Sequence, residues 1–190
     1  MAATKENPKR LSRKDWLAAA LEVLFSEGVG KVSIVRIARD LGVTSGSFYW
    51  HFKDRNDLLR SLLDFWVHSQ TVAILEKVDQ FEGTPSERLL KLMELLTLGE
   101  QARYEVAIRA WAGFDDMAAK VVRGADKRRI EWLRAMFRKL GFKGNEAEMR
   151  ARLFVYYQLA EPSVLWRESK SKRREIMRLR HRLLTSRAPT

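Results

Sequence analysis

The chain has 190 residues, 46% of them hydrophobic, with no apolar run long enough to span a membrane and no secretion signal, so we expect a cytoplasmic protein with a buried core. It has no cysteine and only three histidines, which argues against disulfides, thiol chemistry and a metal site; we expect no metal and no cofactor. The formal net charge of +12 favours a polyanionic partner.

The excess positive charge lies at the two ends of the chain. Residues 1–60 carry 11 Lys and Arg against 7 Asp and Glu, residues 163–190 carry 9 against 2, and residues 61–162 carry 16 against 15. Each basic end either meets a polyanion or forms a solvated, solubilising face. The charge alone leaves both interpretations open.

The first part of the chain predicts three short helices. Helical periodicity runs through almost the whole sequence and no segment shows sustained strand-like alternation, so we expect an all-α protein. Ser12 and Asp15 form a capping box for a first helix that ends at Gly28. Ser33 is expected to cap a second helix that ends at Gly42, and Thr44 a third.

Longer helices are expected in the rest of the chain. Asp54 should open one that runs to about Gln80, and Thr84, Pro85 and Glu87 supply the cap, first-turn proline and capping-box carboxylate of the next. The remaining predicted helices cover 101–112, 115–140 with a possible kink at Gly124, Asn145 toward Trp166 with a bend at Pro162, and Lys172 to Ser186.

The segment GVTSGSFYWHF, Gly42 to Phe52, follows a tight turn between two helices. This is the helix-turn-helix arrangement, whose second helix enters the major groove of DNA. Phe48 and Phe52 lie four residues apart, so we expect them to anchor that helix to Leu21, Phe25 and Ile37. Tyr49, Trp50 and His51 would then face outward, with polar tips that can donate to phosphate oxygens.

The ordered set LFSEG, SIVRIARDLGV, TSGSFYWHF and KDRNDLL, within residues 12–60, resembles the TetR family of bacterial transcription regulators. The resemblance implies a homodimer, a variable C-terminal ligand domain, and release from DNA when a small molecule binds. Together with the outward position of Trp50, it places the DNA-binding residues at or near Ser33, Arg36, Thr44, Ser45, Gly46, Ser47, Tyr49, Trp50, His51, Lys53 and Arg55.

The expected organisation has three parts. Residues 1–11 form a basic N-terminal tail, 12–58 an N-terminal three-helix helix-turn-helix DNA-binding domain, and 59–190 a helical ligand-binding and dimerisation domain. Lys5, Lys9, Arg10, Arg13 and Lys14 either reach phosphates or the minor groove as a basic arm, or belong to a disordered solubilising tail.

Aromatic side chains are frequent in the later helices, where they could line a pocket for an aromatic or amphipathic effector. Arg109 could bind a carboxylate there, although an exposed helix face also explains it. Aromatic residues at helical spacing also form cores, so that alternative stays open. The candidate ligand-binding residues are Trp66, Tyr104, Arg109, Trp111, Phe114, Trp132, Tyr156 and Tyr157.

Two apolar stripes near the C-terminus suggest a dimer interface. They pass through Met149 and Leu153 on one helix and through Ile176, Leu179, Leu183 and Leu184 on the next. Paired with their symmetry mates they would form a four-helix interface and predict a near-palindromic operator with half-sites about one DNA turn apart. Alternatively, both stripes cover the core of their own chain.

These features predict a sequence-specific DNA-binding transcriptional regulator, a repressor released from double-stranded DNA by a small-molecule effector. The alternative is a non-enzymatic ligand-binding or adaptor protein without specific DNA binding. The sequence has no Gly-rich phosphate loop, nucleophile elbow or metal-ligand pair, so we expect no enzyme and no catalytic residues.

Overall fold

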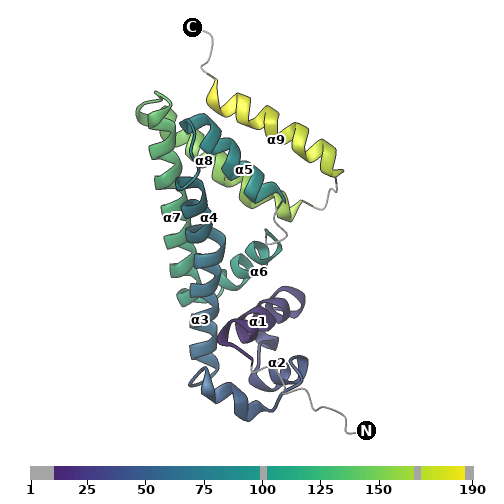
Figure 1. Cartoon of the computed structure of the whole chain (residues 1–190). Helices are drawn as coiled ribbons and strands as arrows, with labels where there is room; N and C mark the ends of the chain where they lie inside the picture. Colours follow the sequence, from purple (N-terminus) through teal and green to yellow (C-terminus); the bar gives the residue numbers. More distant parts are fainter. Residues whose placement is uncertain (1–10, 99–101, 165–167, 187–190) are drawn as a thin grey trace. The chain divides into compact units, whose positions relative to one another are not determined.

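The computed structural model describes residues 11–98, 102–164 and 168–186, and every regular element in these ranges is a helix (Figure 1). This confirms the predicted all-α class. The chain divides into two compact units, Met1–Leu62 and Leu63–Thr190. Among the described residues, no helix is both long and apolar enough to cross a bilayer.

The first helix, α1 (Arg13–Glu27), begins and ends where the sequence predicts. The Ser12 amide donates to Asp15 Oδ2 at 2.7 Å and the Ser12 hydroxyl accepts from the Asp15 amide, which completes the capping box. Gly28 ends the helix with φ 82°, a backbone conformation that side-chain-bearing residues rarely adopt. The predicted basic tail, residues 1–11, lies outside the described residues except for Leu11.

Helix α2 (Ile34–Asp40) is capped by Ser33, whose hydroxyl accepts from the Arg36 amide. The chain then reverses at Gly42, with φ 68°, and the Val43 amide bonds to the Ala38 carbonyl at 3.0 Å. The third element is η2 (Ser45–Trp50), a six-residue 3-10 helix rather than the expected α-helix. Thr44 is its N-cap residue, but the Thr44 side chain makes no capping bond.

Helices α3 (Arg55–Val67) and α4 (Ala73–Asp79) are joined by a π-helical turn, η3 (His68–Val72). They form the expected long helical segment from Asp54 to Gln80, interrupted by one wide turn. The boundary between the two units falls within α3. Buried leucines at positions 58, 59, 62 and 63 lie on the inner side of α3.

Helix α5 (Pro85–Leu98) starts at the predicted capping box, where the Thr84 amide donates to Glu87 Oε2 at 2.7 Å. Helices α6 (Ala102–Ala112) and α7 (Asp116–Lys139) follow, and the Asp115 carboxylate caps α7 by accepting from the Ala118 amide. Helix α7 runs as one α-helix through Gly124, where a kink was possible.

Helix α8 (Gly144–Ala160) begins one residue before the expected start at Asn145, and Lys143 precedes the helix in an extended conformation without a side-chain capping bond. A 3-10 turn, η4 (Glu161–Ser163), follows at Pro162, and Trp166 lies outside the described residues. Helix α9 (Lys170–Thr185) starts two residues earlier than expected because Ser169 caps it.

Helices of the second unit pack around one apolar cluster. Leu89 and Met93 of α5, Phe137 of α7, and Ala151 and Phe154 of α8 are almost fully buried in it. Full burial of each large apolar side chain contributes about 1.5–3 kcal/mol, so this cluster is the main stabilising element of the second unit.

Candidate functional site

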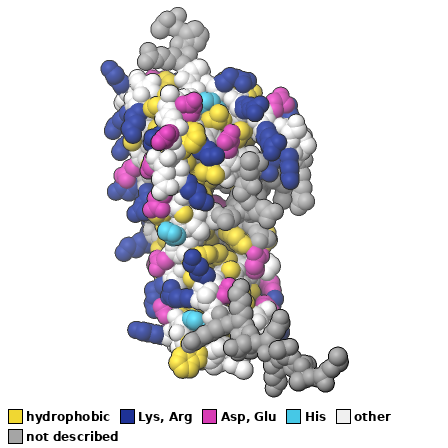
Figure 2. All heavy atoms as spheres, in the orientation of Figure 1, with side chains coloured by type: hydrophobic (Ala, Val, Ile, Leu, Met, Phe, Trp, Pro, Cys, Tyr) yellow, Lys and Arg dark blue, Asp and Glu magenta, His cyan; other side chains and the backbone are white. Residues whose placement is uncertain are grey.

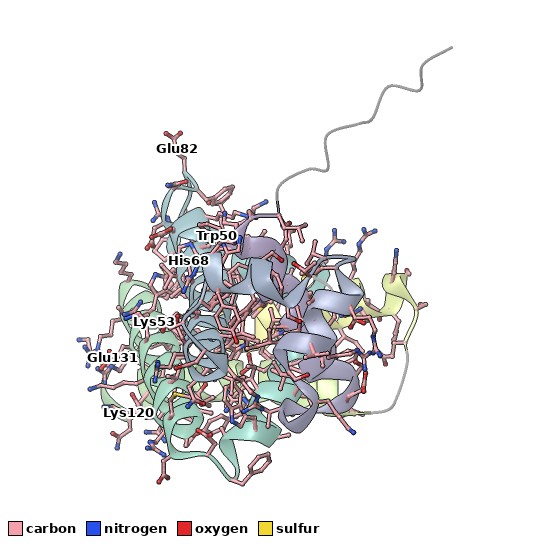
Figure 3. All side chains as sticks on the ribbon, turned by 90° about the horizontal axis from the view of Figure 1, so that it is seen from below. Trp50, Lys53, His68, Glu82, Lys120 and Glu131 are labelled. Carbon is pink, nitrogen blue, oxygen red and sulfur yellow. The ribbon has the colours of Figure 1, made fainter. Side chains whose placement is uncertain are left out.

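The segment from Thr44 to Lys53 presents polar and aromatic side chains to solvent. Tyr49 is 63% exposed and Trp50 is 80% exposed, and Thr44, Gly46 and Lys53 are exposed as well. Ser45, Ser47 and His51 are half-buried. Figure 3 labels the side chains of Trp50 and Lys53.

The exposed segment is held from behind by buried rings. The Phe48 ring is fully buried, 5.4 Å from the Trp16 ring in an edge-on arrangement and 5.2 Å from the stacked Phe52 ring. The Arg13 guanidinium lies 4.7 Å from the Phe52 ring centroid and also donates to the His51 carbonyl. The predicted anchor Phe25 is instead 44% exposed, because the core-facing positions of α1 are Leu17, Leu21 and Leu24.

Backbone hydrogen bonds fix the same segment at both ends. The Ser47 hydroxyl donates to the Thr44 carbonyl at 2.6 Å, and the Lys53 amide donates to Asp57 Oδ2 at 3.0 Å. Within the described residues, no hydrogen bond or ion pair engages the Lys53 ammonium group. Lys53 therefore offers an uncompensated positive charge next to two exposed aromatic rings.

Two predicted DNA-contacting arginines have partners inside the first unit. Arg55 donates to the Val32 carbonyl at 2.6 Å and to the Val29 carbonyl at 2.7 Å, so its guanidinium ties α3 to the loop before α2. Arg36 pairs with Asp40 at 2.8 Å and with Glu27 at 2.7 Å. The hydrogen bonds with Asp40 and Glu27 raise the pKa of Arg36.

These partners show what Arg36 and Arg55 bind in the structure, and their assignment as DNA contacts stays a prediction. A guanidinium has five N–H donors, and the bonds of Arg55 to the loop carbonyls use Nε and Nη2. The spacing of Arg36 and Asp40, four residues apart on one helix, was a signal for such a pair. Nothing local in the sequence indicates that Arg55 reaches Val29. Ser33 is also occupied, as the cap of α2.

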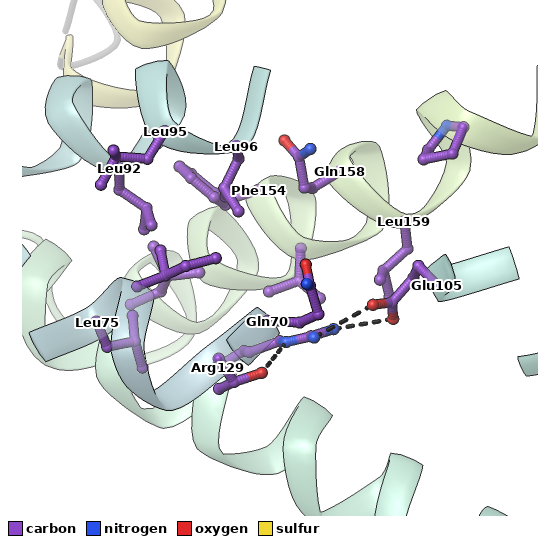
Figure 4. Close-up of a pocket in the computed structure, with 15 residues that line it drawn as sticks. Gln70, Leu75, Leu92, Leu95, Leu96, Glu105, Arg129, Phe154, Gln158 and Leu159 are labelled. Atoms are coloured by element: carbon purple, nitrogen blue, oxygen red, sulfur yellow. Dashed lines mark hydrogen bonds and ion pairs between the residues drawn. The ribbon is translucent and has the colours of Figure 1, made fainter. Parts of the chain in front are cut away.

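A cavity of about 90 Å³ lies within the second unit (Figure 4). Its walls come from α4, α5, α6, α7 and α8, together with the π-helical turn η3 and the 3-10 turn η4, and they are mainly aliphatic. The apolar lining residues are Ile74, Leu75, Leu92, Leu95, Leu96, Leu133, Phe154, Val155, Leu159 and Pro162. The polar lining residues are Gln70, Thr71, Glu105, Arg129 and Gln158.

Arg129 connects the polar groups of the cavity. Its Nη1 and Nη2 donate to the two carboxylate oxygens of Glu105 at 2.9 and 3.2 Å, and its Nε donates to the Thr71 hydroxyl at 2.9 Å. Behind this pair, Arg109 donates to Glu105 at 2.9 Å and to Asp126. Burial lowers the pKa of Arg109, but the hydrogen bonds and charges of Asp126 and Glu105 outweigh it, and the net shift is upward.

None of the predicted ligand-binding residues lines this cavity. Trp66 and Trp111 are buried in the core, Tyr104 is half-buried, and Arg109 lies behind Glu105. Trp132 donates its indole N–H to Asp79 at 3.2 Å. Phe114 is exposed between α6 and α7, and Tyr156 and Tyr157 are exposed on α8.

The sequence analysis missed the lining residues for a physical reason. Aliphatic residues at helical spacing look the same whether they fill a core or surround a void. Glu105 and Arg109 are four residues apart, and Asp126 and Arg129 are three apart, so two neighbouring helices each carry an opposite-charge pair. That was the available signal for the polar side of the cavity.

An exposed apolar groove runs along α8 and α9. Met149, Leu153, Leu179 and Leu183 line it or lie beside it with 46% or more of their surface exposed. The predicted dimerisation residue Leu184 lines the groove and also packs in the core, with 8% of its surface exposed, and Ile176 is half-buried. Met177, Arg180 and Leu184 turn inward because they share one face of α9 at spacings of three and four.

Arg180 is one of three charged residues that line this groove, with Glu146 and Arg150, and it is 8% exposed. Its guanidinium lies 4.2 Å from the Tyr157 ring centroid, and Nη2 donates to Gln158 at 3.4 Å. Within the described part of the chain, its Nε and Nη1 have no hydrogen-bond partner. Burial lowers the pKa of Arg180.

Comparison with known proteins gives one matching family, "Bacterial regulatory proteins, tetR family", over residues 17–62. The chain is 31% identical over 107 residues to "HTH-type transcriptional regulator AcrR" of Shigella flexneri, a match covering 54% of this chain and 50% of that protein. The chain spans about half the length of the curated relatives it matches.

Solved structures share the fold along most of the chain. A transcriptional regulator from Rhodococcus sp. Rha1 superposes with a TM-score of 0.69 at 21% identity, covering 92% of this chain and 96% of its own. AibR, solved in complex with isovaleryl coenzyme A and operator DNA, superposes with a TM-score of 0.68 at 17% identity, covering 91% and 97%. Both matches extend through the helices that surround the cavity.

Proposed function

We propose that this chain is a sequence-specific DNA-binding transcriptional regulator of the TetR type, because its residues 17–62 match the model of the tetR family of bacterial regulatory proteins. The observation that carries the proposal is the exposed segment from Thr44 to Lys53, anchored by the buried Phe48. Its position after the tight turn at Gly42 is that of a recognition element in a helix-turn-helix.

The DNA contacts fall on the side chains that the fold leaves exposed. Thr44, Tyr49 and Trp50 can donate hydrogen bonds to phosphates or base edges, and Lys53 can neutralise a phosphate. Ser45, Ser47 and His51 complete the surface, and Gly46 permits close approach of the backbone. Arg36 and Arg55 support the surface from within rather than binding DNA.

The second unit is proposed as the effector-binding and dimerisation part. Its cavity provides an enclosed site for a small molecule, and AibR, which has the same fold, was solved with both an acyl coenzyme A and operator DNA. A ligand that binds better to the DNA-free state would release the operator, which makes the protein an effector-controlled repressor.

A homodimer is proposed through the groove of α8 and α9. Four large apolar side chains are exposed there, and a second copy would cover them. The partner could also supply acceptors for Nε and Nη1 of Arg180, which have none among the described residues. Two recognition segments related by a two-fold axis would then read a near-palindromic operator.

The proposal is tested by selecting bound fragments from random DNA and measuring the affinity of the full chain for the selected site against scrambled DNA. We expect specific binding and a plot of log affinity against log salt with a slope of about −5 to −9, for roughly 6–10 neutralised phosphates per dimer. Equal affinity for selected and scrambled DNA would contradict the proposal and favour a ligand-binding or adaptor protein.

The matched variants for this experiment are a double substitution, Tyr49→Ala with Lys53→Ala, and a control, Lys127→Ala. The first removes exposed groups of the proposed interface, and the second removes one exposed positive charge from α7. The double variant should lose specific binding, whereas the control should retain it. A net-charge effect alone would weaken binding in both.

A further inference from the structure

The cavity of the second unit has one polar side and otherwise aliphatic walls. In Figure 4, Leu92, Leu95 and Leu96 of α5 lie across the cavity from Arg129 of α7. Such a distribution suits a ligand that is mostly hydrocarbon with a single polar end. Phe154 is the only ring among the described lining residues, so the walls give no flat aromatic slot between two rings.

The charges beside the cavity cancel. Arg109 and Arg129 are two cations and Glu105 and Asp126 two anions, and every guanidinium is hydrogen-bonded or ion-paired to the carboxylates. We call these four residues the charge cluster. The Arg129 and Glu105 side chains are 14% and 10% exposed, so water screens them little. A charged ligand would lose its own hydration and find no spare charge of opposite sign.

The other polar residues of the wall, Gln70, Thr71 and Gln158, are uncharged, and the last two offer donors. The Thr71 hydroxyl accepts from Arg129 Nε, so its proton is left to be donated. The Gln158 side-chain oxygen accepts from Arg180, which directs its amide N–H groups to other acceptors. Both groups suit a ligand oxygen that accepts hydrogen bonds without carrying a full negative charge.

The π-helical turn provides an independent sign of a functional site. Gln70 and Thr71 belong to this turn, and Thr71 is the residue that Arg129 binds. Single π-helical turns inside α-helices occur frequently at functional sites, since they cost helix stability. Here the turn faces the polar side of the cavity.

We propose that the cavity binds an uncharged aliphatic molecule with one hydrogen-bond-accepting oxygen, such as an alcohol, ketone, ester or amide, and that the charge cluster discriminates against carboxylates and ammonium ions. The inference rests on the proposed effector role of the second unit, whose ligand class it names. It replaces the aromatic effector expected from the sequence, because the predicted rings lie elsewhere.

The test uses four probes with the same six-carbon chain: 1-hexanol, hexanamide, hexanoate and hexylammonium. Binding to the full-length protein is measured by calorimetry at pH 7. We expect the two neutral probes to bind. The dissociation constants of the two ions should be higher by a factor of about ten or more.

Charge variants make the test specific to the cluster. Glu105→Gln leaves one net positive charge and should raise the affinity for hexanoate about tenfold, whereas Arg129→Gln leaves one net negative charge and should do the same for hexylammonium. Asp126→Asn makes the same change of charge as Glu105→Gln, and Asp126 is more exposed than Glu105. This variant therefore replaces Glu105→Gln in the test if the Glu105 variant fails to fold. Glu131→Gln is the control, since Glu131 points outward from α7 (Figure 3).

The inference would be overturned if hexanoate or hexylammonium bound the unaltered protein as tightly as hexanol, or if the charge variants left the preferences unchanged. Absence of binding by all four probes would overturn it as well. The proposed function fails separately, in operator binding. If neutral probes bind but do not change operator affinity, the ligand class stands and the regulatory role fails. If only charged compounds release the operator, the regulatory role stands and the ligand class fails.

Discussion

The candidate sites of the two units place their tryptophans and charged side chains in opposite ways. In the first, Trp50 and Lys53 project into solvent from a segment anchored by the buried Phe48. In the second, Trp66 and Trp111 are buried, and Glu105 and Arg129 face an internal cavity. A large partner such as DNA is bound by projecting groups, whereas a small molecule is bound by enclosing walls.

The two sites should also differ in how much stability a substitution removes. Projecting groups can be removed with little loss of stability, so their variants report on binding alone. Groups around the cavity support the fold as well, and their variants change stability and binding together. Figure 2 shows Lys and Arg side chains scattered over the face it presents rather than gathered in one patch, so net charge alone does not identify either site.

The largest expected effect comes from the anchor of the projecting segment. Phe48→Ala should destabilise the first unit by about 3–5 kcal/mol, because it removes a fully buried ring that contacts Trp16 and Phe52. Hydrogen exchange of the α1 and α2 amides measures the change. Trp50→Ala is the control, with an expected change within about 0.5 kcal/mol. Equal losses in the two variants would remove the distinction between anchor and projecting group.

The second-largest effect is expected for a substitution in the exposed groove of α8 and α9, where the second unit exposes apolar side chains. Leu153→Arg should weaken self-association by about 2–4 kcal/mol, because a charge would enter the centre of an apolar interface. Sedimentation equilibrium measures the dimer dissociation constant. Phe114→Arg places the same charge on an exposed ring outside the groove and should leave self-association unchanged. A monomeric unaltered protein would reject this interface.

Arg55 is a basic residue of the first unit whose guanidinium binds backbone carbonyls, whereas the Lys53 ammonium group is exposed to solvent. Arg55→Met should lower the free energy of unfolding by about 1.5–3 kcal/mol, through loss of the bonds to Val29 and Val32. The salt dependence of DNA binding should stay the same. Arg60→Met, at an exposed position of α3, is the control for stability. A changed salt slope without a stability loss would restore Arg55 as a phosphate contact.

Lys53 should show the opposite behaviour. Lys53→Ala removes one proposed phosphate contact, so the slope of log affinity against log salt should fall in magnitude by about one, with stability nearly unchanged. Fluorescence anisotropy with labelled operator at several salt concentrations measures the slope. An unaltered slope would place Lys53 outside the interface.

The smallest effect concerns a cap remote from both sites. The hydrogen bonds from the Thr84 amide and hydroxyl lower the pKa of Glu87 below its usual 4.5. Because the folded-state pKa is depressed, the stabilisation is present above pH 4.5 and is lost as pH falls through the folded-state value. Glu87→Gln should therefore be slightly less stable than the unaltered protein at pH 7 but not at pH 3. Urea denaturation at both values measures this, and a pH-independent difference would argue against the capping role.

The extent to which the sequence predicted the molecule depends on how local each feature is. The capping boxes at Ser12 and Thr84 and the turn at Gly42 are decided by residues within one helical turn, and all three predictions were confirmed. The projecting segment could likewise be located, because its anchor and its exposed groups alternate within one short stretch.

The cavity could not be located this way. Arg129 meets Thr71 and Glu105, which lie 58 and 24 residues away in the chain, so their meeting is decided by the packing of separate helices. The depth of Leu184 could not be predicted for a related reason: a periodic apolar stripe shows which residues share a face, but not that Leu184 would pack in the core as well as line the groove.

The wide turn at His68–Val72 also fixes the rotational phase of α4. Deleting one residue there would return the segment to regular α-helix and rotate everything after it by roughly 100° about the helix axis. Val78, now fully buried, would swing away from its pocket, and Ile74 and Leu75 would leave the cavity wall. The length of this turn is therefore as strongly constrained as the identity of any side chain that it carries.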